Sequence, residues 1–364
     1  MLRPTASSIW LAFRSSGKRH LLLTGGRGSG KTTMLRALTA FLAPEVPPGV
    51  TSWAEPGRGV FLQENATGAR RQVGAFDPAL PGPENRMRPL ADGFAGFGAA
   101  ALGHCAEAPG DWATVDEVGY LETTSPAYTA ALEKLFARKR VLAAVRRQEL
   151  PFLRALCARA DVFLVDLDAP FGLCGCVLMA SGLGRRFGGN KLLADFRGRP
   201  LVQCAIDATA NVFARRVLVT RSAEVTALGR RQGIRTVLHA EPCRADAIRL
   251  GLAALQEGPA LTGCLFCPCD QPLLRRDTVA ALALAAAGEP DAIWRPAAGG
   301  AAGAPVLFPA WAFPALAALP AGRGGGAVIR KNPDRLRLLA IDDAMELADV
   351  DRPEDLVRLA AAGK

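Results

Sequence analysis

The chain has 364 residues, a length that predicts about two domains. Half of the residues are hydrophobic and 21% are charged, as in an ordinary globular protein, and no apolar run reaches the length of about 18 residues that a membrane span requires. The net charge is +10, but the arginines are scattered and only 6% of the residues are aromatic, which argues against a nucleic-acid-binding surface. We therefore expect a cytoplasmic protein that binds neither nucleic acids nor membranes.

Residues 1–17 form the first segment, an N-terminal extension whose apolar patch is too short and too interrupted by charge for a signal peptide. Residues 18–168 then alternate between strand-like and helix-like patterns, which predicts an α/β domain with a mainly parallel sheet. Strands are expected at 19–24, 112–115, 140–145 and 162–165, and helices at 31–42, 126–138 and 151–159. The Gly- and Pro-rich stretch 44–110 shows only short strand-like pieces such as 59–62.

A glycine loop, Gly25–Thr32, lies between the first expected strand and helix and fits the P-loop pattern G-x-x-x-x-G-K-S/T. In this pattern the glycines let the backbone curl around a β-phosphate, the lysine reaches the β- and γ-phosphate oxygens, and the hydroxyl helps to hold Mg²⁺. ATP or GTP is therefore the expected ligand of this domain. The predicted nucleotide-binding residues are Gly25, Gly28, Gly30, Lys31, Thr32 and Thr33.

Two acids, Asp116 and Glu117, come directly after the expected strand at 112–115. Asp116 is expected to hold Mg²⁺ together with Thr32, and Glu117 to polarise an attacking water. Glu117 and Glu122 could instead be solvated loop acids. The run 115–122, VDEVGYLE, resembles the Walker B segment of a small P-loop family of nucleoside triphosphatases once described from thermophiles. The resemblance covers roughly residues 19–166 and implies a P-loop NTPase fold, with hydrolysis less directly implied than binding because Arg58 is the only arginine where the family has an arginine-rich segment.

After a short linker, 169–173, the alternation of strands and helices restarts and predicts a second α/β domain at 174–364. Strands are expected at 174–180, 216–220, 236–239, 262–267, 291–295, 304–308 and 336–341, and helices at 200–212, 223–232, 244–256, 276–287 and 353–361. The two halves show no repeat, because their glycine loops differ in spacing and in the residues that come after them. Each domain is therefore expected to have its own nucleotide chemistry.

A second glycine loop, 182–191, comes after the strand expected at 174–180 and reads GLGRRFGGNK. Gly182 and Gly184 allow close approach to a base and phosphates, while Arg186 and Lys191 supply cations for a triphosphate and a departing pyrophosphate. Asp270 lies just beyond the strand expected at 262–267, the position where α/β sheets place ligands, although it could instead cap the next turn.

The stretch 178–193, together with PCDQPL at 268–273, resembles the signature of the MobA-like nucleotidyltransferases, within which molybdenum cofactor cytidylyltransferases are the most similar group. The resemblance covers about residues 174–360 and implies a Rossmann-like fold of the nucleotide-diphospho-sugar transferase type. It implies Mg²⁺ on Asp270 beside the α-phosphate of CTP, and Gln271 favours the cytidylyl branch. Ala180, Gly182, Gly184 and Asn190 are the residues expected to bind this nucleotide.

Three weaker segments agree with this resemblance: 244–252 after the base-binding loop, 303–308 near the acceptor, and 349–355 close to the end of the chain. One of Asp349 and Asp351 is expected as a second metal ligand, with Asp351 the residue chosen, although Asp351 could equally be only the cap of the helix that begins at Pro353. The loop Gly322–Gly326 lacks the aspartate that the family has there.

The expected reaction is direct in-line attack by the terminal phosphate of a molybdopterin-type cofactor on the α-phosphorus of CTP, with release of pyrophosphate. Lys191, Asp270 and Arg186 are the predicted catalytic residues of this domain, and Glu117 is that of the first. One alternative is nucleotidyl transfer to another phosphorylated acceptor, such as a sugar phosphate. The other is a nucleotide-switched chaperone that hands the cofactor to an apo molybdenum hydroxylase.

Overall fold

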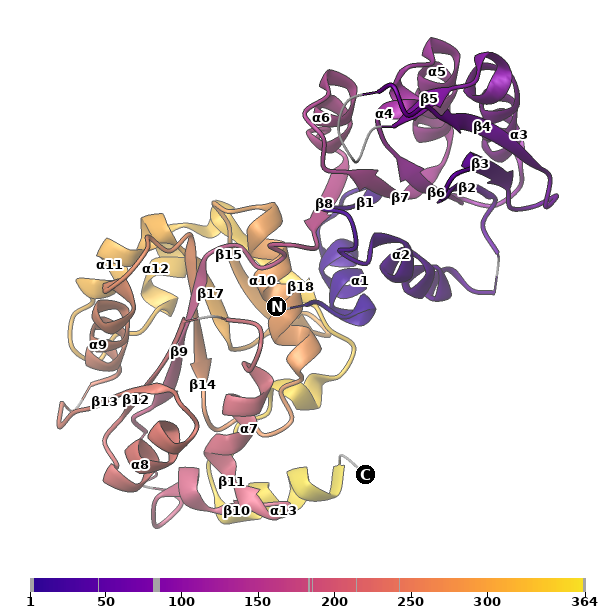
Figure 1. Ribbon diagram of the computed structural model, residues 1–364. Helices are drawn as coiled ribbons and strands as arrows, with labels where there is room; N and C mark the ends of the chain where they lie inside the picture. The colour runs from indigo at the N-terminus through magenta and orange to yellow at the C-terminus, as the bar shows by residue number, and fades with distance from the viewer. Residues whose placement is uncertain are drawn as a thin grey trace. The chain divides into compact units, whose positions relative to one another are not determined.

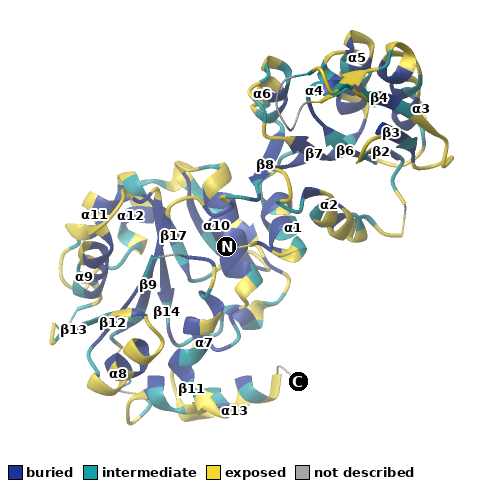
Figure 2. Ribbon diagram, in the orientation of Figure 1, coloured by how far each residue is buried: buried dark blue, intermediate teal, exposed yellow. Residues whose placement is uncertain are grey.

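The computed structural model describes residues 3–44, 46–80, 86–182, 184, 186–213, 215–241 and 243–362. The chain divides into two compact units. The first unit is Gly17–Asp168, and the second unit is Ala169–Lys364 together with Met1–Ser16. Each unit has its own sheet with helices packed on it (Figure 1), and the buried residues lie on the strands and on the helices that pack against them (Figure 2). Both units are therefore α/β, as the alternating pattern predicts.

The sheet of the first unit has the order β5-β4-β3-β2-β6-β7-β1-β8. Five strands run parallel: β2 (Gly49–Glu55), β6 (Trp112–Val118), β7 (Arg140–Arg146), β1 (His20–Gly25) and β8 (Val162–Asp166). The helices are α2 (Lys31–Thr39), α3 (Ala99–Glu107), α4 (Tyr120–Thr123), α5 (Pro126–Arg138) and α6 (Pro151–Cys157). Every residue of β1 is buried, so the glycine loop after it starts from the middle of the core.

An antiparallel meander extends this sheet through β3 (Gly59–Glu64), β4 (Arg70–Phe76) and β5 (Met87–Pro89). The sequence suggested only short strand-like pieces here, because the strands are short, half-exposed and bounded by glycines that normally indicate loops. Gly49 shows what one such glycine does: a Cβ atom there would lie 2.5 Å from the Thr114 carbonyl oxygen, where β2 pairs with β6. The glycine allows two backbones to approach closely and does not mark a turn.

The sheet of the second unit has the order β13-β12-β9-β14-β17-β15-β16, and β18 also pairs with β15. Its strands are β9 (Cys174–Ala180), β12 (Arg215–Thr220), β13 (Arg235–Leu238), β14 (Gly263–Pro268), β15 (Ile293–Ala298), β16 (Ala301–Ala302), β17 (Val306–Pro309) and β18 (Leu336–Ala340), with a separate hairpin of β10 (Asp195–Phe196) and β11 (Arg199–Pro200). From β9 the chain adds β12 and β13 on one side and then returns to add β14, also parallel, on the other. The carboxyl ends of β9 and β14 therefore form a topological switch point, the usual ligand position in an open α/β sheet.

The helices of the second unit are α7 (Leu201–Ala208), α8 (Ala223–Arg231), α9 (Arg244–Gln256), α10 (Arg276–Gly288), α11 (Phe313–Ala317), α12 (Gly326–Lys331) and α13 (Pro353–Ala362). Residues 1–17, expected as an extension, contain a further helix, α1 (Ala6–Ser15), that packs against α10 and β18. Ile9 and Phe13 lie one turn apart and are buried, and the Ser15 hydroxyl accepts a hydrogen bond from the N–H of Ala340 at 3.0 Å. Among the described residues no helix has the length and apolar character of a membrane span.

Candidate functional site

A cavity of about 800 Å³ lies at the carboxyl ends of β9 and β14 in the second unit. Its lining comes from segments far apart in the sequence: the loop after β9, the loop after β14, the start of α9, the segment 303–308, the start of α12 and the segment 347–351. The lining includes Gly182, Gly184, Arg186, Lys191, Asp270, Asp349 and Asp351. The switch point of the sheet and the predicted site residues therefore coincide.

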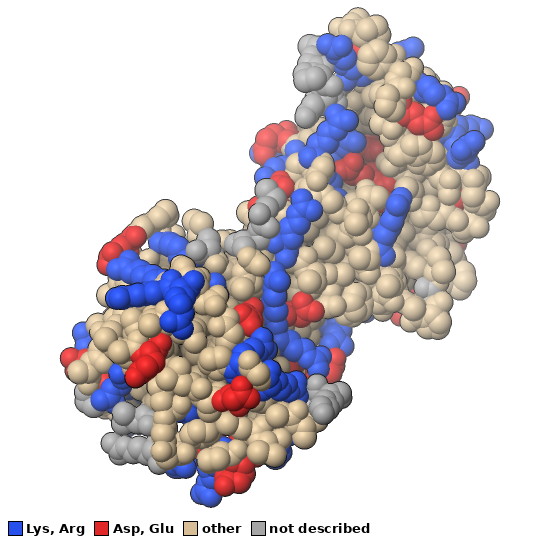
Figure 3. Space-filling model, turned by 60° about the horizontal axis from the view of Figure 1, so that its bottom comes forward, with Lys and Arg blue, Asp and Glu red and all other residues tan. Residues whose placement is uncertain are grey.

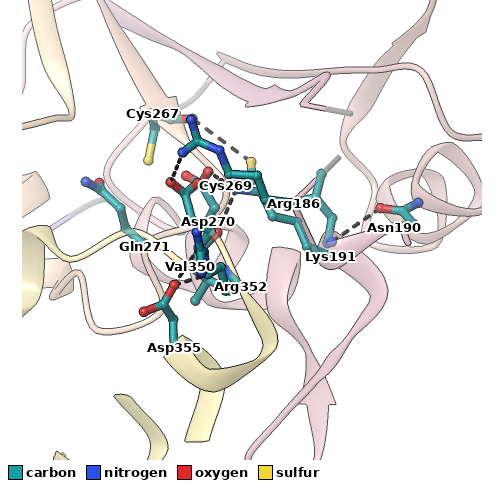
Figure 4. A network of polar contacts seen from close by, with 12 residues as sticks. Arg186, Asn190, Lys191, Cys267, Cys269, Asp270, Gln271, Val350, Arg352 and Asp355 are labelled. Carbon is teal, nitrogen blue, oxygen red and sulfur yellow. Dashed lines mark hydrogen bonds and ion pairs between the residues drawn. The ribbon is translucent and has the colours of Figure 1, made fainter. Parts of the chain in front are cut away.

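Lys191 and Asp270 form the centre of this cavity (Figure 4). The Lys191 ammonium donates to Asp270 at 2.6 Å and to the Val350 carbonyl at 2.7 Å, and its side chain is only 9% exposed. Asp270 lies just beyond the end of β14, so a rigid central strand fixes its carboxylate. A buried lysine with two strong acceptors holds its charge at a defined point, which suits the binding of phosphate oxygens.

Arg186 extends the positive charge toward the mouth of the cavity. Its guanidinium lies 3.2 Å from the Asp351 carboxylate, and Asp351 also lies 3.7 Å from the Lys191 ammonium. The Asp351 side chain therefore faces the cations, and the cap of α13 is made by Asp355, which accepts hydrogen bonds from the N–H groups of residues 351 and 352. This geometry favours a role for Asp351 in the cavity over a role as the cap of α13.

Asp349 is a third carboxylate of this cavity that the sequence did not separate from Asp351. Desolvation raises the pKa of Asp349, and the negative charge of Asp270 raises it further. Hard oxygen donors that repel one another suit a divalent cation such as Mg²⁺. Within the described residues, however, no three His, Cys, Asp or Glu side chains form a ready metal-ligand cluster, so phosphate oxygens of a bound substrate would have to complete the coordination.

The other residues predicted to bind this nucleotide do not all lie on the cavity lining. Gly184 has φ +56°, and a Cβ atom there would lie 2.5 Å from the Gly189 carbonyl oxygen, so the loop requires glycine. Ala180 is buried and accepts a hydrogen bond from the Thr220 hydroxyl, while the Asn190 side chain caps the turn at Leu192 and is absent from the cavity lining. Leu183 and Arg185 of the glycine loop lie outside the described residues.

Several lining residues carry no signal in the sequence, because they come from elements with no motif. Arg295 on β15 donates from Nε to the Gly303 carbonyl at 2.8 Å. Ser181 lies 2.7 Å from Nε2 of His239, but Nδ1 of that histidine is buried without a hydrogen-bond partner. A serine nucleophile needs a base that a third group orients, so this pair does not change the expectation of direct attack.

A second cavity, of about 890 Å³, surrounds the glycine loop of the first unit. All six predicted residues of that loop, Gly25, Gly28, Gly30, Lys31, Thr32 and Thr33, line it. Gly28 and Gly30 adopt positive φ angles of 77° and 95°, which turn the loop into the start of α2. The Lys31 ammonium donates to the carbonyls of Gly25 and Gly26 at 3.0 and 3.1 Å, and it therefore lies across the loop.

Asp116 lies beside this loop, but β6 runs through Asp116 and Glu117, whereas both acids were expected after the end of this strand. The Thr32 hydroxyl donates to its carboxylate at 3.0 Å, and burial raises the pKa of Asp116. Glu117 lies between two cations, 3.3 Å from the Lys31 ammonium and 2.9 Å from Nε of Arg146. Arg146 had no assigned role in the sequence, yet it pairs with the predicted water-polarising acid.

Glu122 also lines this cavity, but its surroundings differ from those of Glu117. It is 6% exposed and accepts a hydrogen bond from the N–H of Gly119 at 2.9 Å. Burial raises the pKa of Glu122 to about 7. This acid is therefore a buried structural partner of the turn after β6 and not a solvated loop acid.

On the face drawn in Figure 3, Lys and Arg side chains are interspersed with Asp and Glu. Many arginines pair with acids of their own unit, as in the Arg199–Asp207 pair at 2.6 Å and the Arg235–Glu257 pair at 2.7 Å. The arrangement resembles an ordinary mixed surface.

Comparison with known proteins adds a family to the second unit. Residues 176–336 match the family described as "MobA-like NTP transferase domain". The "Probable molybdenum cofactor guanylyltransferase" of Bacillus licheniformis is 31% identical over 109 residues, which is 29% of this chain and 53% of that protein. The chain thus spans about half the length of this curated relative.

Among solved structures, Rv0371c from Mycobacterium tuberculosis H37Rv is 24% identical with a TM-score of 0.46, over 52% of this chain and 98% of that one. THEP1 from Aquifex aeolicus is 15% identical with a TM-score of 0.35, over 41% of this chain and 89% of that one. These scores are too low to add to the argument. The family match stands without them: residues 176–336, which include Lys191 and Asp270, match the MobA-like NTP transferase domain and support a nucleotidyltransferase domain in this part of the chain.

Proposed function

We propose that the second unit transfers the CMP group of CTP to the phosphate of a molybdopterin-type cofactor and releases pyrophosphate. The observation that carries this proposal is the convergence of Lys191, Arg186 and Asp270 on one cavity at the switch point of the sheet. The MobA-like family match and the name of the Bacillus licheniformis relative support it. An apo molybdenum hydroxylase is the proposed recipient of the product.

The side chains of the cavity suit a direct displacement. The ammonium of Lys191 and the guanidinium of Arg186 are positioned to bind the negative charge of the triphosphate and of the leaving pyrophosphate. Asp270, together with Asp349, would hold Mg²⁺, which supplies charge neutralisation at the α-phosphate when it is bound. The chain's own contribution is then orientation and fixed charge, with no covalent intermediate.

The base preference rests on Gln271, the residue immediately after the catalytic aspartate. Its side chain is 3% exposed, and its amide donates to the Leu347 carbonyl at 3.1 Å. We place CTP first because the sequence around Gln271 resembles the cytidylyl branch, whereas the Bacillus licheniformis relative is named a guanylyltransferase.

Pyrophosphate release from CTP, GTP and ATP, each with and without molybdopterin cofactor, tests the proposal. Release that requires both CTP and cofactor supports the proposal. If, of the three nucleotides, only GTP releases pyrophosphate with the cofactor, the reaction type stands but the proposed nucleotide changes from CTP to GTP. No pyrophosphate with any nucleotide would refute the transferase assignment.

For the first unit we propose binding and hydrolysis of ATP or GTP with Mg²⁺. The hydroxyl of Thr32 and the carboxylate of Asp116, 3.0 Å apart beside the glycine loop, are oxygen donors of the kind that Mg²⁺ prefers. Glu117 would orient the attacking water. Equilibrium binding of ATP and GTP to the intact chain and to Lys31→Ala tests this, because loss of the lysine should remove binding. Equal binding by both would refute the assignment.

A further inference from the structure

The cavity of the first unit extends well beyond the glycine loop, and its lining combines two kinds of chemistry. The loop 25–33 contributes backbone N–H groups and Lys31. Strands β2–β5 and α4 contribute an apolar and aromatic part of the lining, called here the aromatic end: Trp53, Val60, Phe76, Met87 and Tyr120. The lining also includes Arg86, Arg146 and Arg147. Phosphates suit the glycine loop and the cations, so the aromatic side chains are available to a different chemical group.

This aromatic end is held in place by contacts of its own. The Trp53 indole donates from Nε1 to Glu55 at 3.1 Å, and its ring stacks on Phe61 with 5.9 Å between centroids and 21° between planes. The Tyr120 hydroxyl donates to the Met87 carbonyl at 3.0 Å and so joins α4 to β5. Aromatic faces held in fixed positions are typical of a pocket for a planar ring.

Phe76 is the exposed member of this wall. It lies at the end of β4, its side chain is 41% exposed, and it lines the cavity. A large apolar side chain on a cavity rim contributes little to the core, but it provides a surface for a ligand.

Glu117 lines the same cavity, between two cations. One carboxylate oxygen is 3.3 Å from the Lys31 ammonium, and the other is 2.9 Å from Arg146. An acid beside a phosphate-binding lysine, in a cavity that is also lined by aromatic side chains, is positioned to accept a proton from a hydroxyl group bound there.

We infer that the first unit is a phosphotransferase whose acceptor is an alcohol carried by a planar nitrogen heterocycle, of the nucleoside or pterin type. The inference rests on the proposed binding of ATP or GTP at the glycine loop. The acceptor oxygen forms a bond to the γ-phosphorus while the bond from that phosphorus to the β,γ-bridging oxygen breaks. The bridging oxygen keeps the electron pair and leaves as part of the nucleoside diphosphate, and the hydroxyl proton passes to Glu117. Water is then the poorer of two acceptors, used when the aromatic end is empty.

The test is label transfer by the full chain from γ-labelled ATP or GTP in Mg²⁺, with two sets of acceptors. The four ribonucleosides form one set and neopterin, a pterin with an alcohol side chain, forms the other, so the two sources of a planar ring are distinguished. We expect labelled phosphate monoester from at least one set. We also expect the Phe76→Ala variant to raise the KM of the acceptor by about tenfold or more, because a stacking face is lost.

Phe41→Ala is the matched control, since Phe41 belongs to the same unit, is 39% exposed and does not line the cavity. It should keep the acceptor KM of the wild type. Label that appears only as orthophosphate with every acceptor would overturn the phosphotransferase inference and leave hydrolysis standing. Absence of nucleotide binding would overturn both the inference and the proposed function of this unit.

Discussion

Removal of the Lys191 ammonium should damage the second unit in two separable ways. In Lys191→Ala, Asp270 and the Val350 carbonyl lose donors at 2.6 and 2.7 Å. A charged hydrogen bond is worth about 1.5–3 kcal/mol and an ordinary one about 1 kcal/mol. Because the Asp270 side chain is 24% exposed, water replaces part of the first contact. We therefore expect a loss of about 2–3 kcal/mol in the free energy of unfolding.

The loss of turnover should be larger than the loss of stability explains. A fixed donor to developing phosphate charge contributes about 10²–10³-fold to the rate. Pyrophosphate release, measured at a temperature where denaturation curves show the variant to be folded, should fall by that factor. Arg199→Ala is the control, because its ion pair with Asp207 is 46% exposed on both sides and lies outside the cavity lining. Turnover within about threefold of wild type in folded Lys191→Ala protein would refute the reasoning.

Three further predictions concern other parts of the chain. Asp116→Asn should weaken ATP binding in Mg²⁺ by about tenfold or more, because the proposed Mg²⁺ site beside Thr32 loses its carboxylate. The difference should vanish in EDTA, and an effect that persists in EDTA would contradict this. Burial raises the pKa of Glu122 from 4.5 to about 7, so the folded state binds this proton more tightly than the unfolded state, and stability is lost as the pH rises from 4.5 through 7. Melting curves of Glu122→Gln at a series of pH values should lack this loss. The same dependence of melting temperature on pH in the variant and the wild type would contradict the prediction. Gly325→Ala should lower the free energy of unfolding of the second unit by about 1–3 kcal/mol, the range typical of overpacking, because the new Cβ would lie 2.8 Å from the Phe308 ring. Gly326→Ala, whose new Cβ would have no neighbour nearer than 3.5 Å, should leave the melting curve unchanged.

Elements with strong local signals could be predicted from the sequence. The expected limits of α5, β9 and α9 agree residue for residue with the structure. In α5 the boundary is set by the Ser125 cap and by Pro126 at the first position. The helix expected at 200–212 ends at Ala208, since Asn211 has a positive φ of 57° that no periodic pattern shows.

Strands β2, β4 and β5 and helix α1 were missed for a common physical reason, whereas 59–62 in β3 was expected as a strand-like piece. They form by pairing and packing with segments far away in the sequence, which a local window does not contain. Met87–Pro89 is a strand only because it pairs with β4, and Ile9 and Phe13 are core residues only because α10 and β18 cover them.

The candidate sites divide in the same way. Glycine loops with nearby lysines are local motifs, so Lys31 and Lys191 could be identified directly. Two other contacts depend on the folded sheet. Arg186 pairs with Asp351, which lies 165 positions away in the sequence, and Arg146 pairs with Glu117. Such partners carry no motif, because their positions depend on strand order and not on spacing.

Transfer of the α-phosphate tests the central claim most directly. CTP labelled at the α-phosphorus, and in a parallel reaction at the γ-phosphorus, would be incubated with the protein, Mg²⁺ and molybdopterin cofactor. We expect the α-label on the cofactor and the γ-label in pyrophosphate, with both lost in Lys191→Ala and kept in Arg199→Ala. The contrary result has two parts: the α-label never reaches the cofactor from CTP or GTP, and the γ-label appears only as orthophosphate. If Lys31→Ala also abolishes that orthophosphate, the second unit is not the transferase described above.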